Sequence, residues 1–133
     1  MKIRALLIDD EHNSREILRN YLTKYCPDVA IVCEARGIQD ALIFLKSHAV
    51  DLLFLDVEMP HGNAFDLLEQ LPDRDFETVF VTAYDQYAME ALNNHATYYL
   101  LKPLSIDELI KAVQVVKEIK TKGDHIKDIR LSD

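Results

Sequence analysis

The sequence predicts a single α/β domain built on a five-stranded parallel sheet with helices on both faces. Short apolar runs alternate along the chain with longer stretches in which apolar residues recur three and four positions apart. Such alternation of strand and helix patterns is typical of βαβ units, whose strands run parallel. The length of 133 residues is that of one domain with a substantial core.

The strands are predicted where four to six successive residues are largely apolar, because both faces of a parallel sheet are covered by helices. These runs are 3–8, 29–33, 51–55, 78–81 and 97–101. Right-handed crossovers permit few arrangements of five such strands, and the flavodoxin-like order 2-1-3-4-5 is the commonest. The predicted fold is therefore a three-layer sandwich. Its ligands should bind at the carboxyl ends of the strands, between the first and the third.

Five helices are predicted between and after the strands from apolar residues that share one helical face. The capping-box pattern of Ser105 and Glu108 marks the start of the fifth helix. A domain of residues 1–120 is expected, and residues 121–133 are expected to form a polar tail or the start of a linker. The predicted faces comprise Ile17, Leu18, Tyr21, Leu22 and Tyr25; Ile38, Ala41, Leu42 and Leu45; Phe65, Leu67, Leu68 and Leu71; Tyr87, Ala88, Ala91 and Leu92; and Ile106, Leu109, Ile110, Val113 and Val116.

Composition limits the partners and the compartment. The formal net charge is −8 and the isoelectric point is near 5.0. The domain itself is therefore a poor electrostatic match for DNA or RNA, and it suits a divalent cation or a basic protein surface better. Cys26 and Cys33 lack metal-ligand spacing and are expected to be free thiols. Asp9 and Asp10 interrupt the first apolar run, which is too short for a signal peptide or a membrane span, so a cytoplasmic protein is expected.

Reactive side chains follow four of the predicted strands. Asp9 and Asp10 end the first strand, Asp56 the third, Thr82 the fourth and Lys102 the fifth. The carboxyl ends of parallel strands meet at one edge of the sheet, so three carboxylates, one hydroxyl and one ammonium should converge there. The second strand, which ends near residues 34–35, contributes no obvious reactive group.

The convergence of these charges indicates a cation site. Two carboxylates about 4 Å apart repel by roughly 4 kcal/mol at an effective dielectric near 20. Lys102 offsets one charge, and Mg²⁺ suits the remainder because it accepts one or two carboxylates together with phosphate oxygens. A cation, a hydroxyl and an ammonium can together hold a phosphoryl group, and Asp56 can then act as a nucleophile.

Each of these residues also has a purely structural interpretation. An aspartate after an apolar strand is usually an exit residue, and the acidic run 9–11 can favour a helix N-terminus through the helix dipole. Thr82 can be an ordinary β-branched strand residue, and Lys102 a solvated charge. Their coincidence at successive strand ends favours the site.

At these residues the chain resembles the receiver domain of two-component response regulators. The matching segments are IDDE at 8–11, FLDVEMP at 54–60, FVTAYD at 80–85 and YYLLKP at 98–103. The four segments occur in order at suitable spacing, and the resemblance extends from residue 2 to about residue 120. The segment TAYDQYAMEAL at 82–92 is most similar to the receivers of LytTR-type transcription regulators.

The resemblance implies a role for each acidic residue. Asp56 would be the phosphoacceptor. Asp9 and Asp10 would hold Mg²⁺, Asp10 more directly and Asp9 through water, together with Asp56 and the backbone carbonyl of Glu58. Glu58 also stands two residues after Asp56, where phosphatases that act on external substrates by the same chemistry carry an acid/base.

The resemblance also implies how the domain would switch. Thr82 and Lys102 would hold the phosphoryl oxygens, and Tyr99 would turn inward when Thr82 moves towards the phosphate. The alternative for Tyr99 is a plain half-buried strand residue, and Tyr98 should point to the opposite face. Pro103 would follow a cis peptide bond.

One loop departs from the family pattern. Ala64 stands where a glycine is expected after Met59-Pro60, and Gly62 is displaced towards the acceptor. Because glycine adopts positive φ cheaply, Gly62 or Asn63 is predicted to take the left-handed conformation. This departure therefore concerns the shape of the loop and does not affect the chemistry expected at Asp56.

The expected function is a phosphorylation-controlled switch. A sensor histidine kinase would donate the phosphoryl group, and the domain would catalyse only its own Mg²⁺-dependent phosphotransfer and autodephosphorylation. Two alternatives are a phosphatase, for which no cap domain or substrate pocket is visible, and a phosphorylation-independent binding module, which should have a broken acidic site. The output is expected to be transcription, with DNA bound only through an output domain outside this chain.

The expected readout surface comprises the fourth helix, the fifth strand and the fifth helix. It carries Glu90, Lys111, Lys117 and Lys120, and the fifth helix adds Val115 and Ile119 beyond its main apolar face. A homodimer through this surface is one interpretation. Completion of the core, or contact with the tail, is the other.

Overall fold

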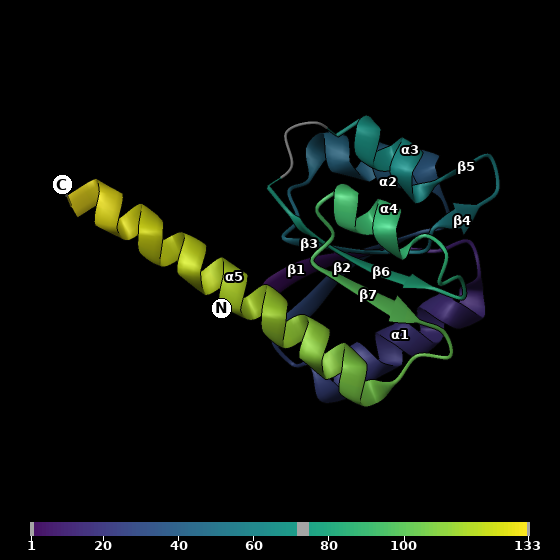
Figure 1. The fold of residues 1–133 in the computed structure, drawn as a ribbon, viewed down its shortest axis with the longest axis horizontal. Coiled ribbons are helices and arrows are strands. Elements are labelled where there is room, and N and C mark those ends of the chain that lie inside the picture. Colours follow the sequence, from purple (N-terminus) through teal and green to yellow (C-terminus); the bar gives the residue numbers. More distant parts are fainter. Residues whose placement is uncertain (1, 72–74, 133) are drawn as a thin grey trace.

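The computed structural model describes residues 2–71 and 75–132, the last nine of them (124–132) by their backbone alone. Its main sheet has five parallel strands in the order β2-β1-β3-β6-β7 (Figure 1). A separate two-stranded antiparallel hairpin, β4-β5, follows β3. The strands are β1 (Ile3–Ile8), β2 (Val29–Ala35), β3 (Leu52–Leu55), β4 (Glu58–Met59), β5 (Gly62–Asn63), β6 (Glu77–Thr82) and β7 (Tyr98–Leu101). With the hairpin set aside, this is the predicted 2-1-3-4-5 sheet.

Helices cover both faces of the sheet, as predicted. In Figure 1, α1 and α5 lie below the sheet, and α2, α3 and α4 lie above it. The backbone of α5 remains helical through residues 121–132 and projects from the body of the domain. The helices are α1 (His12–Tyr25), α2 (Ile38–Ser47), α3 (Ala64–Glu69), α4 (Ala88–Asn93) and α5 (Ile106–Ser132).

The two layers of core explain why the strands are continuously apolar. Phe54 packs in the cluster formed with α1 and α5, whereas its neighbours Leu53 and Leu55 pack in the cluster formed with α2 and α3. Each residue of the central strand β3 is fully buried. Burial of one such side chain contributes about 1.5–3 kcal/mol, so the central strands are held firmly in register and their ends are fixed in space.

The predicted apolar faces of the helices are too wide. Ile17 on α1, Leu92 on α4 and Ile110 on α5 are exposed, with Leu92 retaining 63% of its accessible surface. Periodicity places these residues near a buried stripe, but the sheet covers only the centre of each stripe. The capping box of α5 is half formed: Glu108 N donates to Ser105 Oγ at 3.3 Å, while the Glu108 carboxylate accepts from Tyr98 and Lys111.

The structure shows which residues have positive φ in the loop after β4, where the sequence departs from the family pattern. His61 takes the left-handed conformation with φ 66°, and Gly62 also has positive φ, 143°. The prediction that Gly62 or Asn63 has positive φ is confirmed at Gly62, whereas Asn63 is extended with φ −126°. Asn63 instead caps α3, because its side chain accepts from Phe65 N and Asp66 N while Asp66 accepts from Asn63 N.

Two further features concern the expected compartment. Cys26 and Cys33 are both free thiols, the first buried and the second half-buried. Within the described part of the chain, no helix combines the length and the apolar composition needed to cross a bilayer.

Candidate functional site

The carboxyl ends of β1, β3 and β7 bring Asp9, Asp56 and Lys102 together. Lys102 Nζ donates to Asp9 Oδ2 at 2.8 Å and to Asp56 Oδ2 at 2.9 Å. The strand register produces this meeting, since Ile8 pairs with Leu55 and each is followed directly by an acidic residue. Lys102 comes from β7 on the other side of β6, and its backbone N bonds to Thr82 O at 2.8 Å. The predicted convergence of these three residues is thus present.

The three charged side chains are largely removed from water. The exposed fractions are 10% for the Asp9 side chain, 7% for Asp56 and 17% for Lys102. Burial raises the pKa of Asp9 above its usual range, against the opposing hydrogen bonds from Lys102 and Glu11 N. Desolvation alone would lower the pKa of Lys102, but the two carboxylates outweigh it and raise that pKa. One ammonium therefore serves two buried carboxylates, which leaves negative charge in excess.

Asp56 has a free oxygen. Its Oδ1 is buried and has no hydrogen-bond partner among the described residues, whereas Oδ2 is bonded to Lys102. A buried carboxylate oxygen without a partner is costly, so the site is incomplete without a further group. Asp9, Glu11 and Asp56 each offer a carboxylate oxygen, and these oxygens lie within 4.8 Å of one another. Hard oxygen donors so arranged fit a divalent cation such as Mg²⁺.

The acidic segment 9–11 differs from what the sequence suggested. Asp10, expected as the more direct ligand, is exposed and is outside this group of three oxygens, while Glu11 is within it. Glu11 is the residue before α1, its side chain makes no cap, and its backbone N donates to Asp9 Oδ1 at 2.9 Å. The sequence signal that could have indicated this role of Glu11 was its position directly after Asp9 and Asp10 in the run IDDE.

Thr82, Tyr84 and Tyr99 form a connected chain on the other side of the site. Thr82 is fully buried at the end of β6, and its Oγ1 accepts a hydrogen bond from Tyr84 N at 3.4 Å. The Tyr99 hydroxyl donates to the Tyr84 carbonyl, and the Tyr99 ring stacks on Phe80 with centroids 5.8 Å apart. Tyr98 packs with the opposite core cluster, as strand alternation predicts. Thr82 and Tyr99 therefore contact the two ends of one residue in the β6–α4 loop.

Glu58 and Pro103 lie at the edges of the site. Glu58 is exposed on β4, and its carboxylate raises the pKa of the nearby Tyr84 hydroxyl. The peptide bond between Lys102 and Pro103 is cis, the isomer that the resemblance implies.

A buried arginine that contacts the backbone of the site was not predicted. Arg15, on α1, is buried and donates from Nη1 to the Asp9 backbone carbonyl at 2.6 Å. Its Nε lies 3.4 Å from Glu34 Oε1, at the end of β2. The end of β2 thus contributes to the site indirectly. The helical periodicity of α1 could have shown that Arg15 falls on the same side as Leu18 and Leu22.

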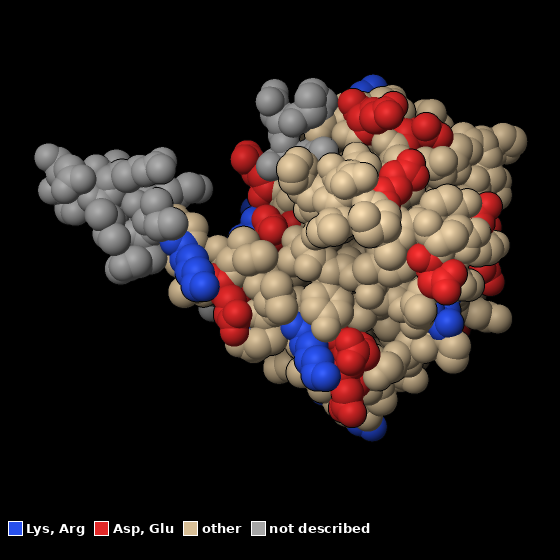
Figure 2. Space-filling view, in the orientation of Figure 1, with Lys and Arg blue, Asp and Glu red and all other residues tan. Residues whose placement is uncertain are grey.

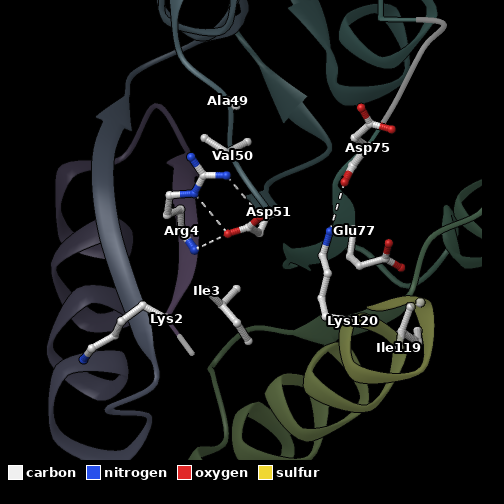
Figure 3. A pocket seen from close by; sticks show the side chains of 11 residues that line it. Lys2, Ile3, Arg4, Ala49, Val50, Asp51, Asp75, Glu77, Ile119 and Lys120 are labelled. Carbon is white, nitrogen blue, oxygen red and sulfur yellow. Dashed lines mark hydrogen bonds and ion pairs between the residues drawn. The ribbon is translucent and has the colours of Figure 1, made fainter. Parts of the chain in front are cut away.

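Two cavities lie at opposite edges of the sheet. One, of about 200 Å³, adjoins Lys102 and is otherwise lined by Ser14, Ile17, Tyr21, Val81, Pro103 and Leu104. A larger one, of about 650 Å³, lies at the amino ends of β1 and β3 beside α5 (Figure 3). There Arg4 pairs with Asp51, and Lys120 Nζ donates to the Asp75 carbonyl at 2.9 Å. The larger cavity holds no excess of buried charge. The smaller cavity, which adjoins Lys102, is therefore the more suitable place for a reacting molecule to bind.

The family model for the response regulator receiver domain matches residues 5–114. The chain belongs to this family. A response regulatory protein of Vibrio cholerae is 38% identical to this receiver domain over 122 residues, which are 91% of this chain and 51% of that protein. The transcriptional regulatory protein BtsR of Escherichia coli is 34% identical over 92% of this chain and 51% of its own length. The chain thus spans about half the length of these relatives.

Solved structures agree with this assignment. The response regulatory domain of mrkE from Klebsiella pneumoniae superposes with a TM-score of 0.83, covering 90% of this chain and 99% of that one; at 24% identity this likeness supports the fold alone. The response regulator TrrA from Thermotoga maritima, in complex with Mg²⁺-BeF, has a TM-score of 0.75 and 30% identity, covering 87% of this chain and 99% of that one.

The family assignment places this chain in two-component signalling. Receiver domains are response regulators that interact with histidine kinases and output domains, and they are not enzymes acting on external substrates. They bind Mg²⁺ in an acidic pocket, and the oxygens of Asp9, Glu11 and Asp56 form a cluster of that kind. Some relatives of this chain are transcriptional regulators.

Proposed function

We propose that Asp56 accepts a phosphoryl group from a phosphohistidine of a sensor histidine kinase and that the domain switches conformation in response. The observation that carries this proposal is the buried Asp56 Oδ1 without a partner, in a carboxylate whose other oxygen is held by Lys102. A nucleophile needs one oxygen whose lone pairs are not already engaged in a hydrogen bond, on a carboxylate that is fixed in orientation. Asp56 offers both.

The transfer would proceed by displacement at phosphorus. A carboxylate oxygen of Asp56 forms the new O–P bond while the P–N bond to the donor imidazole breaks, and the electron pair of that bond leaves with the imidazole. Lys102 and the Thr82 hydroxyl donate hydrogen bonds to the phosphoryl oxygens, where negative charge is concentrated. Hydrolysis of the resulting acyl phosphate by water returns Asp56 to its starting state.

The acidic cluster supports a role for Mg²⁺ in this step. Asp9, Asp10, Asp56 and the Glu58 carbonyl are the proposed ligands, and the Glu11 carboxylate, whose oxygen lies within 4.8 Å of those of Asp9 and Asp56, is a further candidate. Bound Mg²⁺ would neutralise the carboxylates and the incoming phosphoryl oxygens, so that like charges can approach one another. Asp10 is exposed, so its carboxylate must turn inward to take part.

We propose that the kinase docks in the groove formed by the cavity beside Lys102. Ile17 retains 46% of its surface on α1, next to Tyr21 and the loop that carries Pro103 and Leu104. A helix bearing the phosphohistidine can bury apolar side chains against this groove while its imidazole reaches Asp56. Ile17 is therefore proposed as a contact that matters for phosphotransfer from the kinase and not for phosphorylation by a small donor.

The chain from Thr82 to Tyr99 supports the proposed switch. When Thr82 turns towards a phosphoryl group, the Tyr84 backbone loses its contact with Thr82 Oγ1, and the loop that holds the Tyr99 hydroxyl is free to move. The phosphate can shift this equilibrium only through contacts that differ between the two states, and the hydroxyl of Thr82 supplies such a contact.

The surface that would report this switch is apolar at its centre. Figure 2 shows few charges over α4. Met89 retains 68% of its surface, and Leu92 on the same helix and Leu101 on β7 are also exposed. We propose that two receivers associate through this surface after phosphorylation. Lys117 and Lys120 are unsuited to the interface, because they bond within the domain to Asp28 and to the Asp75 carbonyl.

Sedimentation of the phosphorylated protein tests this proposed association. Met89→Glu should prevent the association. Ile43→Glu, which changes an exposed position on α2, should leave it intact.

The proposed output is transcription, through a DNA-binding domain outside these residues. The relatives that match are about twice as long as this chain, and BtsR is named as a transcriptional regulator. We propose residues 1–120 as the receiver and the helical segment 121–132 as the start of the connection to an output domain.

The central experiment is phosphorylation by acetyl phosphate with Mg²⁺, followed by intact mass. The wild-type protein should gain one phosphoryl group, and Asp56→Asn should gain none, because an amide is no nucleophile here. Asp51→Asn is the matched control, since Asp51 precedes the same strand at its opposite end and should leave labelling intact. Equal labelling of Asp56→Asn and the wild type would refute the assignment.

A further inference from the structure

A buried arginine holds the backbone of the acidic site from behind. Only 9% of the Arg15 side chain is exposed, and its Nη1 donates to the Asp9 carbonyl at 2.6 Å. Glu34 lies on the outer side of this guanidinium, 3.4 Å from Nε, and its second oxygen accepts from Arg19 Nη1 at 2.7 Å. A line of contacts therefore runs from the surface of α1, through the end of β2, to Asp9.

With Arg15, the polar groups of Asp9 are bonded on every side. Its backbone N donates to Ala35 O at 3.1 Å, and its carboxylate accepts from Glu11 N at 2.9 Å and from Lys102 Nζ at 2.8 Å. The bond from Arg15 completes this set at the carbonyl. The direction of the Asp9 carboxylate follows from the placement of its backbone, so Arg15 acts on the acidic cluster without touching it.

Helix packing alone does not explain a guanidinium at this position. Ion pairs at buried positions can often be replaced by apolar residues without loss of stability, because desolvation of the charges offsets their attraction. The Arg15 Nε is buried and lies within ion-pair distance of Glu34, but it makes no hydrogen bond with the described residues, so its hydrogen-bonding capacity is not fully used where it lies. The bond to the Asp9 carbonyl is what the guanidinium supplies and an apolar side chain cannot.

We infer that Arg15 is a positioning residue for the cation site, which acts by fixing the Asp9 backbone and thereby the carboxylate that faces Lys102 and Asp56. This inference rests on the proposed Mg²⁺ site. It assigns Arg15 a role in cation affinity, and it assigns Arg19, which shares Glu34 but does not contact Asp9, no such role.

The test is Mg²⁺ affinity in the absence of any phosphodonor, measured by NMR titration of the purified protein. Arg15→Met should raise the Mg²⁺ Kd about tenfold, the usual size for a group that orients a metal ligand. Arg19→Met should change the Kd less than twofold. Leu22→Val on the same helix should lower the melting temperature and leave the Kd unchanged, which separates positioning from general destabilisation. Arg15→Lys keeps the charge and one donor, so its Kd should lie between those of the wild type and Arg15→Met.

The outcomes are distinct. A folded Arg15→Met protein with the wild-type Kd overturns the inference, as does an equal rise in Arg19→Met. If Arg15→Met does not fold, Arg15→Gln replaces it, because that shorter amide does not reach the Asp9 carbonyl and should show the same tenfold loss; a wild-type Kd for Arg15→Gln overturns the inference. If the wild-type protein itself binds no Mg²⁺, the proposed cation site fails, and the role of Arg15 fails with it.

Discussion

The two edges of the sheet carry similar residues in different electrostatic states. At the amino edge, Asp51 pairs with Arg4, which is half exposed to water. At the carboxyl edge, Asp9 and Asp56 share the single ammonium of Lys102 and are largely buried. Although burial opposes it, bonding to Arg4 lowers the pKa of Asp51, whereas burial raises the pKa of Asp9. The charges of Arg4 and Asp51 balance in a partly hydrated pair, which stabilises the structure. The charges of Asp9, Asp56 and Lys102 do not balance and are largely buried, so this cluster favours binding of a further cation.

Among the variants that test this difference between the two edges, Lys102→Met should change the free energy of unfolding most. Removal of the ammonium leaves two buried carboxylates without a cation, which should lower the free energy of unfolding by about 3 kcal/mol at pH 7. Urea denaturation measures the loss. Lys120→Met at the amino edge, where the lysine bonds to an exposed carbonyl, should cost less than about 1 kcal/mol. Similar losses in the two variants would show that the edges do not differ.

Added Mg²⁺ should stabilise the protein through the carboxyl edge alone. At ten times its Kd, an ion that binds only the folded state adds about 1.4 kcal/mol to the free energy of unfolding. Thermal unfolding with and without Mg²⁺ should show this gain in the wild type and in Asp51→Asn. The gain should be absent from Asp56→Asn, and its persistence there would place the cation elsewhere.

The pH dependence of stability should differ in sign between the edges. The raised pKa of Asp9 means that the folded state binds its proton more tightly than the unfolded state. Its charged form therefore costs stability at neutral pH, and this cost disappears as pH falls through the raised pKa. Asp51 has a lowered pKa, so its contribution is present above about pH 4 and is lost as pH falls below that value.

Asparagine variants test these signs in Mg²⁺-free buffer. At pH 7, Asp51→Asn should lower the free energy of unfolding by about 1 kcal/mol, because charge-assisted bonds to Arg4 are lost. Asp9→Asn should lower it less or raise it, because a like charge is removed from beside Asp56. Urea midpoints at pH 7, 5 and 3.5 provide the comparison; a larger loss for Asp9→Asn at pH 7 would reverse the contrast.

The smallest effect concerns the link between Tyr99 and the β6–α4 loop. Tyr99→Phe removes the hydroxyl that donates to the Tyr84 carbonyl and should cost about 0.5–1 kcal/mol. The amide signals of Thr82 and Tyr84 should shift in its NMR spectrum. Tyr98→Phe removes a comparable hydroxyl, bonded to Glu108 on the other face, and should leave those signals in place.

Much of the fold followed from local pattern. The continuous apolar runs located five strands, with β1 predicted to the residue and the others to within two residues at either end. The order of the sheet followed from the handedness of crossovers, and the identity of residues at strand ends showed that Asp9, Asp56 and Lys102 would meet. These features depend on periodicity and chain order, which a sequence displays directly.

The remainder depends on contacts between residues distant along the chain. The sequence showed an acidic run but not that Glu11, in place of Asp10, would lie beside Asp56. Nor did it show that Arg15 would reach the Asp9 carbonyl or that Tyr84 would join Thr82 to Tyr99. Side-chain direction in a loop is decided by which neighbours supply hydrogen bonds and exclude water, and those neighbours come from other strands and helices. The sequence by itself therefore determined which strand ends meet at the site, and the tertiary structure decided which side chains reach it and which of their atoms face one another.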